Sequence, residues 1–248
     1  MKVPAEWTLV KLDDIAEKVM VGIASAATHA YTHHGIRMLR NLNIKEGWID
    51  DSDILYVNEE YERSFRNKRL KAGDILTVRT GYPGVSAVVP DKYEGAQCFT
   101  SLITRINKEK GLPEYVCRFI NSEYGKRFIS SGEAGGAQKN VNAGMLKKMS
   151  IPLPPINEQH KIAKILSTWD EAIATTEQTL ANSEQQKKAL MQQLLTGKKR
   201  LPGFEGEWKD YNLSEIAKII VSPVDKKSNK DEIAVRLCNY TQSLHKFR

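Results

Sequence analysis

The feature that most constrains this chain is the stretch between Pro155 and Gly197, which holds no other glycine or proline. Pro154 and Pro155 end the extended segment before it, since each proline fixes φ and disfavours the helical region for the residue that precedes it. Asn157 is a suitable N-cap and Gly197 a suitable C-cap. About forty residues without a breaker amount to a helix of roughly 60 Å, at 1.5 Å per residue. The sequence therefore predicts one long spacer helix over residues 156–197.

Apolar residues recur along this predicted helix at alternating steps of four and three, which is a heptad-like pattern. A single helix would expose such a stripe to water, so we expect it to pack against a partner. Its length allows its own domain to cover only part of the stripe, which favours an antiparallel helix from another chain or from a missing second half of this one. The expected pairing residues are Ile162, Leu166, Trp169, Ile173, Leu180, Leu190 and Leu194, with Thr176, Ser183 and Lys187 as a polar centre.

The segment 207–217 repeats the pattern of segment 6–16, because Glu, Trp, Leu, Ile and Ala recur at a constant offset of 201 residues. Further on, Val235–Cys238 resembles Ile36–Leu39 at an offset of 199 residues. Internal repetition outranks local pattern as an indicator of architecture. We therefore expect three parts: a complete unit over 1–155, the spacer helix over 156–197, and the truncated start of a second unit over 198–248.

The 248 residues carry 37 Lys and Arg against 30 Asp and Glu, a formal net charge of +7. This moderate excess suits a polyanionic partner. Cys98, Cys117 and Cys238 are few and widely spaced, which argues for a reducing compartment and against a zinc site or a disulfide framework. The first residues lack the apolar core of a signal peptide, and no run approaches the ~18 apolar residues that span a bilayer. We expect a cytoplasmic protein with no membrane segment.

Short β-like runs separated by glycine-containing turns dominate the first unit, and helical patterns flank them. Residues 7–20 predict an extended entry followed by a helix, and Pro113 opens a helix that ends at Gly132. The pattern indicates an α+β fold with a mixed, mostly antiparallel sheet. The expected strands are 37–42, 53–57, 74–79, 85–89 and 102–106.

We find no catalytic signature. A methyltransferase acting on a base amino group needs an Asp- or Asn-Pro-Pro-aromatic motif, whereas Pro154 and Pro155 are flanked by Leu153 and Ile156. No acidic-x-Lys triplet follows Pro90-Asp91 before Pro113, as a metal-dependent nuclease would need, and no phosphate-binding loop is present. Three histidines, His29, His33 and His34, lack nearby cysteines, so we expect solvated or base-reading side chains rather than metal ligands. The sequence predicts no metal site and no cofactor.

Two glycine-rich segments carry the side chains best suited to reading DNA. Segment 79–84 places an arginine, a hydroxyl and an aromatic ring beside two glycines, which let the backbone approach a ligand closely. Segment 135–140 carries amides and an ammonium group that can bind adenine or phosphate. A basic run over 63–71 suits phosphate contacts. For each segment, a plain surface turn or solvated face is the alternative. The candidate DNA-contacting residues are Arg79, Thr80, Tyr82, Gln138, Lys139 and Asn140, together with Arg37, Arg63, Arg66, Lys68 and Arg69.

Several of these motifs resemble the DNA-specificity subunit of type I restriction-modification systems. Ile151–Pro155, followed by Glu158, Gln159 and Ile162, resembles the entry to that family's central spacer helix, and 194–204 resembles the exit from it. The framework residues Glu6, Trp7, Leu12 and Ile15, and the run Leu70 with Gly73–Leu76, are also similar to its target-recognition unit. The resemblance implies two target-recognition domains held apart by two antiparallel helices, each reading half of a split double-stranded DNA site.

The same resemblance implies that methylation and restriction subunits are the partners and carry all catalysis. It covers essentially the whole sequence, except that a second spacer helix is absent. Three other readings stay open at this point: a half-subunit that dimerises through the long helix and reads a symmetric split site, a DNA-modifying enzyme in its own right, and a purely structural coiled-coil adaptor.

Overall fold

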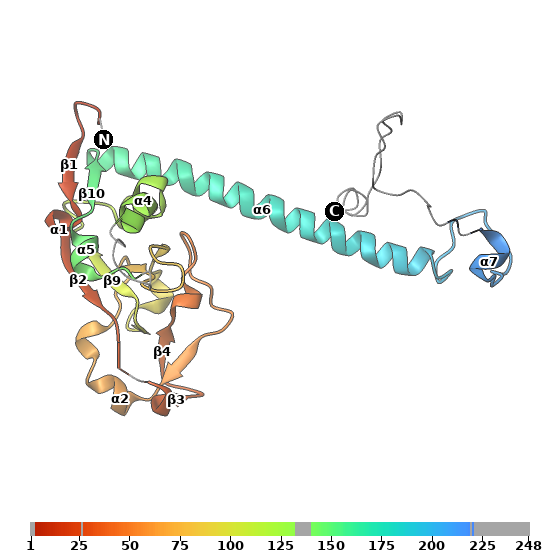
Figure 1. The fold of residues 1–248 in the computed structure, drawn as a ribbon, viewed down its shortest axis with the longest axis horizontal. Helices are drawn as coiled ribbons and strands as arrows, with labels where there is room; N and C mark the ends of the chain where they lie inside the picture. Colours follow the sequence, from red (N-terminus) through yellow and green to blue (C-terminus); the bar gives the residue numbers. More distant parts are fainter. Residues whose placement is uncertain (1–2, 26, 132–139, 219, 221–248) are drawn as a thin grey trace, which may run out of the picture. The chain divides into compact units, whose positions relative to one another are not determined.

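The structure is a computed structural model that describes residues 3–25, 27–131, 140–218 and 220 (Figure 1). The chain divides into two compact units, Met1–Leu180 and Ala181–Arg248. Their boundary falls within the long helix α6 (Ile156–Leu194). In the described part of the chain, no helix is both long enough and apolar enough to cross a membrane.

The first unit is built on three small sheets, and almost all strand pairs are antiparallel. The first sheet has the order β2-β9-β6-β7, with β2 at Ala16–Val21, β9 at Leu102–Ile106, β6 at Ile75–Thr77 and β7 at Ser86–Val88. The second has the order β3-β5-β4-β8, with β3 at Tyr31–Thr32, β5 at Leu55–Val57, β4 at Ile36–Leu39 and β8 at Gln97–Cys98. Among the strands of the described residues, β4 and β8 are the one parallel pair, and Ile23 and Phe99 form an isolated parallel bridge. The predicted α+β fold with mostly antiparallel pairing is therefore confirmed.

The third sheet has two strands from opposite ends of the first unit. Strand β1 (Thr8–Lys11) pairs antiparallel with β10 (Ser150–Leu153), so that Thr8 lies opposite Leu153 and Lys11 opposite Ser150. The Leu12 amide next to this pair donates to the Met149 carbonyl at 2.9 Å. The pairing brings the beginning of the unit against its end.

Short helices connect and cover the sheets. They are α1 (Leu12–Ile15), α2 (Glu59–Arg63), α3 (Pro113–Asn121), α4 (Glu123–Ser131) and α5 (Ala143–Lys147), with 3-10 turns η1 (Thr28–Ala30), η2 (Asn41–Asn43), η3 (Arg66–Lys68) and η4 (Asp91–Tyr93). The largest buried cluster joins the first sheet to α3 and α5. Its members include Leu12, Ile75, Leu102, Val116, Ile120 and Leu146.

For two of the predicted helices, the predicted bounds were wrong. The helix expected before Met20 ends at Ile15, and Ala16–Val21 instead forms β2, because its backbone pairs with β9 and its β-branched residues fit a strand. The helix expected from Pro113 to Gly132 is two helices. Ser122 between them is extended, at φ −66° and ψ 164°, and its hydroxyl donates to the Phe119 carbonyl at 2.6 Å.

The strand expected over 37–42 is also shorter than predicted. It ends at Leu39, and η2 follows because the Asn43 side chain accepts a hydrogen bond from the Arg40 amide and turns the backbone there. The other four expected strands are present as β5, β6, β7 and β9, each within the expected range.

The long helix predicted over 156–197 is present as α6, which ends at Leu194, and its first turns are fixed to the first unit. Gln159 is buried: its amide nitrogen donates to the Pro154 carbonyl at 2.8 Å, and its amide oxygen accepts from the Leu112 amide at 2.8 Å. The Trp7 indole donates to Glu158 at 3.1 Å. Further along, Arg118 donates to the Asp170 carboxylate at 2.7 Å. Beyond these contacts the seam residues Ile173, Leu180 and Leu190 are exposed, and Leu194 is half-buried.

The repeated segments have the same local structure. Helix α7 (Leu213–Ile216) lies 201 residues after α1 and has the same length. In both, the third helical residue is an acid that accepts from the amide of the residue before the helix, Asp14 from Lys11 at 2.8 Å and Glu215 from Asn212 at 3.2 Å. An extended alanine follows each helix. The part of the repeat at 235–238 lies outside the described residues.

A buried carboxylate organises the segment that follows α2. Glu62 is 1% exposed and accepts two hydrogen bonds from Arg69, at 2.6 and 2.8 Å, and one from Gln97 at 2.9 Å. Burial acts to raise the pKa of Glu62, but the hydrogen bonds from Arg69 and Gln97 outweigh it and hold the pKa below the ordinary 4.5. The carboxylate is therefore ionised in the folded protein.

We predict that Glu62→Gln lowers the free energy of unfolding by about 1–3 kcal/mol at pH 7, since Arg69 loses its charged partner. Because the folded pKa is depressed, the contribution of Glu62 is fully present above about pH 5 and is lost as the pH falls through the folded pKa. Urea unfolding from pH 3 to 7 measures this. The wild-type advantage should shrink below pH 4.5. An advantage that is constant over this range would contradict the assignment.

Candidate DNA-reading face and helix-pairing surface

The tip formed by residues 79–84 follows strand β6 and is closed by its own backbone. The Gly84 amide donates to the Val78 carbonyl at 2.9 Å, and Gly81 and Gly84 have φ values of 86° and 95°, a left-handed conformation that favours glycine. Tyr82 is 81% exposed at the end of this turn. The tip therefore presents an aromatic side chain on a backbone of fixed shape.

Arg79 links the tip to the second predicted segment. Its Nε donates to the Val141 carbonyl at 3.2 Å, and the Val141 amide donates to the Arg79 carbonyl at 3.1 Å. Val141 is buried, and the neighbouring Asn140 is exposed. The tip thus bonds the residue directly after the second glycine-rich segment, of which the structure describes Asn140 alone. Gln138 and Lys139 lie outside the described residues.

A third segment, residues 40–53, lies against the tip, and the sequence did not point to it. The Asn41 amide nitrogen donates to the Thr80 hydroxyl at 3.3 Å and to its carbonyl at 3.4 Å, and the Gly47 amide donates to the Ser86 carbonyl at 2.9 Å. We call residues 40–53 the Asn43 loop. Thr80 therefore belongs to the tip and also accepts hydrogen bonds from this loop.

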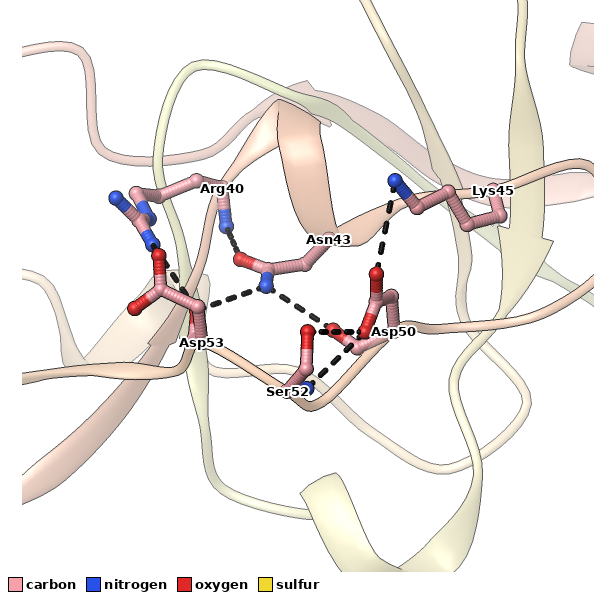
Figure 2. Close-up of polar contacts among 6 residues, drawn as sticks. All are labelled: Arg40, Asn43, Lys45, Asp50, Ser52 and Asp53. Atoms are coloured by element: carbon pink, nitrogen blue, oxygen red, sulfur yellow. Dashed lines mark hydrogen bonds and ion pairs between the residues drawn. The ribbon is translucent and has the colours of Figure 1, made fainter. Parts of the chain in front are cut away.

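Figure 2 shows how the Asn43 loop is fixed from within. Asn43 is fully buried, accepts from the Arg40 amide at 2.8 Å and donates to the carbonyls of Asp50 and Asp53, both at 3.0 Å. Arg40 forms an ion pair with Asp53 at 2.7 Å. Hydrogen bonds from Ser52 and the charge of Lys45 lower the pKa of Asp50 below 3.8. One buried amide therefore joins both ends of the loop.

The other basic residues predicted to contact DNA differ in whether their side chains already bind another part of the protein. Arg63 and Arg66 are exposed, and Arg66 lies 4.0 Å from Glu62. The Lys68 ammonium donates to the Gly22 carbonyl at 2.9 Å. Arg69 binds Glu62, as described above. The Arg37 guanidinium donates to the Lys92 carbonyl at 2.6 Å and lies 5.9 Å from the centre of the Tyr93 ring. Lys68, Arg69 and Arg37 thus have hydrogen-bonding partners, Arg66 is exposed but forms a long ion pair with Glu62, and Arg63 is exposed.

The described residues contain no group of three or more histidine, cysteine or acidic side chains placed to hold a metal. His29 packs edge-to-face on Tyr61 with 5.3 Å between ring centres, and His33 and His34 are exposed. Burial raises the pKa of both Cys98 and Cys117 to about 12, so these thiols stay protonated and are poor nucleophiles.

The seam of α6 is a second candidate surface. Along this seam, Trp169 is 66% exposed, Leu180 60% and Ile173 54%. The residues at the two ends of the seam are less exposed. Near its start, Ile162 and Leu166 form one wall of a groove of about 360 Å³ that is otherwise lined largely by aromatic residues. The other lining residues include Trp7, Tyr115, Phe119 and Tyr124. The sequence predicted the stripe but not this groove, since its aromatic wall comes from three separate segments.

Comparison with known proteins places these surfaces in a family context. Residues 4–185 match the family model described as the type I restriction modification DNA specificity domain. The chain is 30% identical over 229 residues to a candidate MjaX specificity subunit of a type I restriction enzyme of Methanocaldococcus jannaschii, covering 88% of this chain and 51% of that protein. It is 27% identical to the MjaVIII specificity subunit of the same organism, covering 81% of this chain and 48% of that protein.

Solved structures share the fold. The crystal structure of the HsdS subunit from Thermoanaerobacter tengcongensis aligns with a TM-score of 0.57 and 19% identity, over 83% of this chain and 52% of that chain. A chain from a structural study of complex assembly and conformational transition in the type I R-M system aligns with a TM-score of 0.59 and 20% identity, over 84% of this chain and 53% of that chain. The chain thus spans about half the length of the relatives it matches.

We predict that Asn43→Ala destabilises the Asn43 loop, because the Arg40 amide and two carbonyls lose the partner that reaches them inside the fold. The free energy of unfolding should fall by about 1–3 kcal/mol. The control is Ser52→Ala, which removes an exposed hydroxyl from the same network and should cost about 0.5 kcal/mol or less. Thermal and urea unfolding of both variants measure the difference. Equal costs would contradict the central role of Asn43.

Proposed function

The chain belongs to the family of type I restriction-modification DNA specificity domains, and on that premise we propose that it is a non-catalytic DNA-specificity subunit. In this proposal residues 1–155 read one half of a split double-stranded DNA site, and 156–197 act as spacer and pairing helix. Residues 198–248 begin a second unit. Methylation and restriction subunits would be its partners and would supply the catalysis, and a DNA-binding role would place it in the cytoplasm.

The observation that carries the DNA-reading part is the contact of the tip with Val141, next to Asn140. Arg79 holds them together, and an exposed Tyr82 and an exposed Asn140 stand on the two sides of this contact. Loops held on a rigid sheet can place hydrogen-bonding side chains at base edges without an inserted recognition helix. Exposed Arg63 and Arg66 would add phosphate contacts.

Arg79 has two possible roles, which a pair of variants separates. One guanidinium nitrogen, Nε, donates to the Val141 carbonyl, and within the described residues the two terminal nitrogens make no hydrogen bond. The two terminal NH₂ groups of an arginine are the ones that donate hydrogen bonds to guanine or to phosphate. Arg79 would then orient the second segment and contact DNA with the same side chain.

We predict that Arg79→Ala weakens binding to a duplex selected by the wild-type chain from a randomised library. The expected cost is about 1–3 kcal/mol, with relaxed preference at one base pair if Arg79 reads a base. A pure phosphate contact would instead weaken binding uniformly and reduce the salt slope by about one unit. Arg63→Ala is the matched control for a phosphate contact. Unchanged affinity, preference and salt slope in Arg79→Ala would remove Arg79 from the interface.

We further propose that α6 pairs with a second long helix that runs antiparallel, and that a second copy of this chain can supply it. The seam is symmetric in spacing, so an antiparallel copy would set Ile162 opposite Leu194 and Leu166 opposite Leu190. Leu190 and Leu194 would then enter the groove beside Trp7. Charge supports this register, because the acids at 170–171 would lie near the lysines at 187–188 of the other copy. Trp169 would face Lys187, a cation–π arrangement.

We predict that Ile173→Ala raises the dissociation constant of this pair about tenfold or more, because each copy loses a buried side chain. Ile165→Ala is the matched control, since Ile165 is 59% exposed against 54% for Ile173 but lies off the seam. Sedimentation equilibrium over a concentration series measures both. A chain that stays monomeric at high concentration, or equal effects of the two variants, would exclude self-pairing through the seam.

A further inference from the structure

The Asn43 loop carries apolar side chains that are exposed to solvent and do not pack in the core. Among the described residues before α6, five large apolar or aromatic side chains are exposed, and three of them lie on the Asn43 loop or the tip. Those three are Leu42 at 48%, Trp48 at 57% and Tyr82 at 81%; the other two are Leu9 and Tyr124. Because Asn41 and Gly47 bond directly to Thr80 and Ser86, the loop and the tip form one continuous surface.

The loop holds Trp48 in a fixed place. The Lys45 amide donates to the Trp48 carbonyl at 2.9 Å, and Ile44 and Ile49 form an antiparallel bridge beside it. Ile49 and Ile44 are buried in the core next to Leu76 and Val78. The residues on either side of the indole are thus anchored, and the indole itself is left in solvent.

The acidic side chains of the loop are neutralised by cations from two other parts of the first unit and from the loop itself. Glu46 pairs with Lys126 of α4 at 3.0 Å, Asp50 with Lys45 at 3.6 Å, Asp51 with Lys92 of η4, and Asp53 with Arg40 at 2.7 Å. Four acids close to a phosphate backbone would repel it, and this pairing removes most of that repulsion. The same pairing leaves the loop with no excess positive charge to bind phosphate. The exposed apolar side chains of the loop are therefore its most prominent groups for a contact that does not depend on phosphate.

From these observations we propose that the Asn43 loop is a further sequence-reading element of the chain, in which Trp48 and Leu42 make apolar contacts with bases of the DNA site beside the tip. The proposal rests on the proposed DNA-reading function and extends it to residues that carry no charge. Apolar side chains discriminate bases through the thymine methyl group or by wedging against a base step. Their contribution is independent of counterion release, since no phosphate is neutralised.

The test uses the full chain and a library of duplexes with a randomised core, from which the wild-type chain selects a bound duplex. Trp48→Ala should bind that duplex about five- to fifty-fold more weakly, on the scale of losing burial of one large side chain. The salt slope should not change, and reselection from the library should show relaxed preference at one or two positions. Arg63→Ala should show the reverse pattern, with a smaller salt slope and unchanged preference.

The matched control is Trp208→Ala, since Trp208 is 56% exposed and lies in the second compact unit. Its variant should bind the selected duplex as the wild-type chain does. Leu42→Ala is a second variant that leaves the indole in place and should weaken binding in the same direction. Circular dichroism melting of each variant checks that the fold is retained.

Two results overturn the proposal in different ways. If the wild-type chain binds DNA but Trp48→Ala and Leu42→Ala keep its affinity and base preference, the loop does not read DNA and the proposed function stands. The exposed indole would then be assigned to a protein partner, tested by loss of methylation-subunit binding in the same variant. If the wild-type chain enriches no duplex from the library, the DNA-reading function itself fails and this inference fails with it.

Discussion

The antiparallel pairing of β1 with β10 is the constraint on which the rest of the structure depends. It joins Thr8–Lys11 to Ser150–Leu153 and so closes the first unit at the point where α6 begins. Trp7, just before β1, bonds Glu158 in the first turn of the helix, and Tyr115 of α3 donates its hydroxyl to the Pro152 carbonyl at 2.6 Å. A one-residue slip in this pair would turn each strand residue to the other face. The direction in which the spacer leaves the unit is therefore fixed by this pairing.

Formal charge is a poor guide to the surface of this chain. Several of its basic side chains are engaged inside the fold, among them Arg69 with Glu62, Arg105 with the buried Asp74 at 2.7 Å, and Lys68 with the Gly22 carbonyl. These contacts leave the net charge of +7 unchanged, but the cations that make them are held by other groups and are less free to contact a polyanion. The loops proposed to read DNA have a shape fixed by internal hydrogen bonds, such as those of Arg79 with Val141 and of Asn41 with Thr80.

The two surfaces differ in the physical reason for their exposure. The seam of α6 is apolar at both ends and has a polar centre, a pattern that makes sense only against another helix of similar length. The exposed groups of the proposed DNA-reading face stand on short turns anchored by buried residues, as Trp48 is anchored by Ile44 and Ile49. One surface therefore suits a repetitive contact along a helix, and the other suits a few precisely placed side chains.

The sequence by itself determined the features that arise from neighbouring residues. An unbroken run between Pro155 and Gly197 predicts α6 because nothing in it disfavours the helix, and the spacing of its leucines and isoleucines predicts the seam. The turns at Gly81 and Gly84 could also be predicted, because they too arise from neighbouring residues. The same holds for the repeat that forms α1 and α7. Only the tertiary structure decided that Ala16–Val21 is a strand, since its partner β9 lies more than eighty residues away.

Long-range contacts also decided which polar side chains remain available. Arg69 and Arg63 look alike in the sequence, yet one is held by a buried carboxylate and the other is in solvent. The Asn43 loop joined the candidate site only because Asn41 reaches Thr80 across the fold, a contact that no local pattern encodes. Local propensity thus specified the helix and the turns, whereas strand partners and side-chain pairing across the chain specified the site.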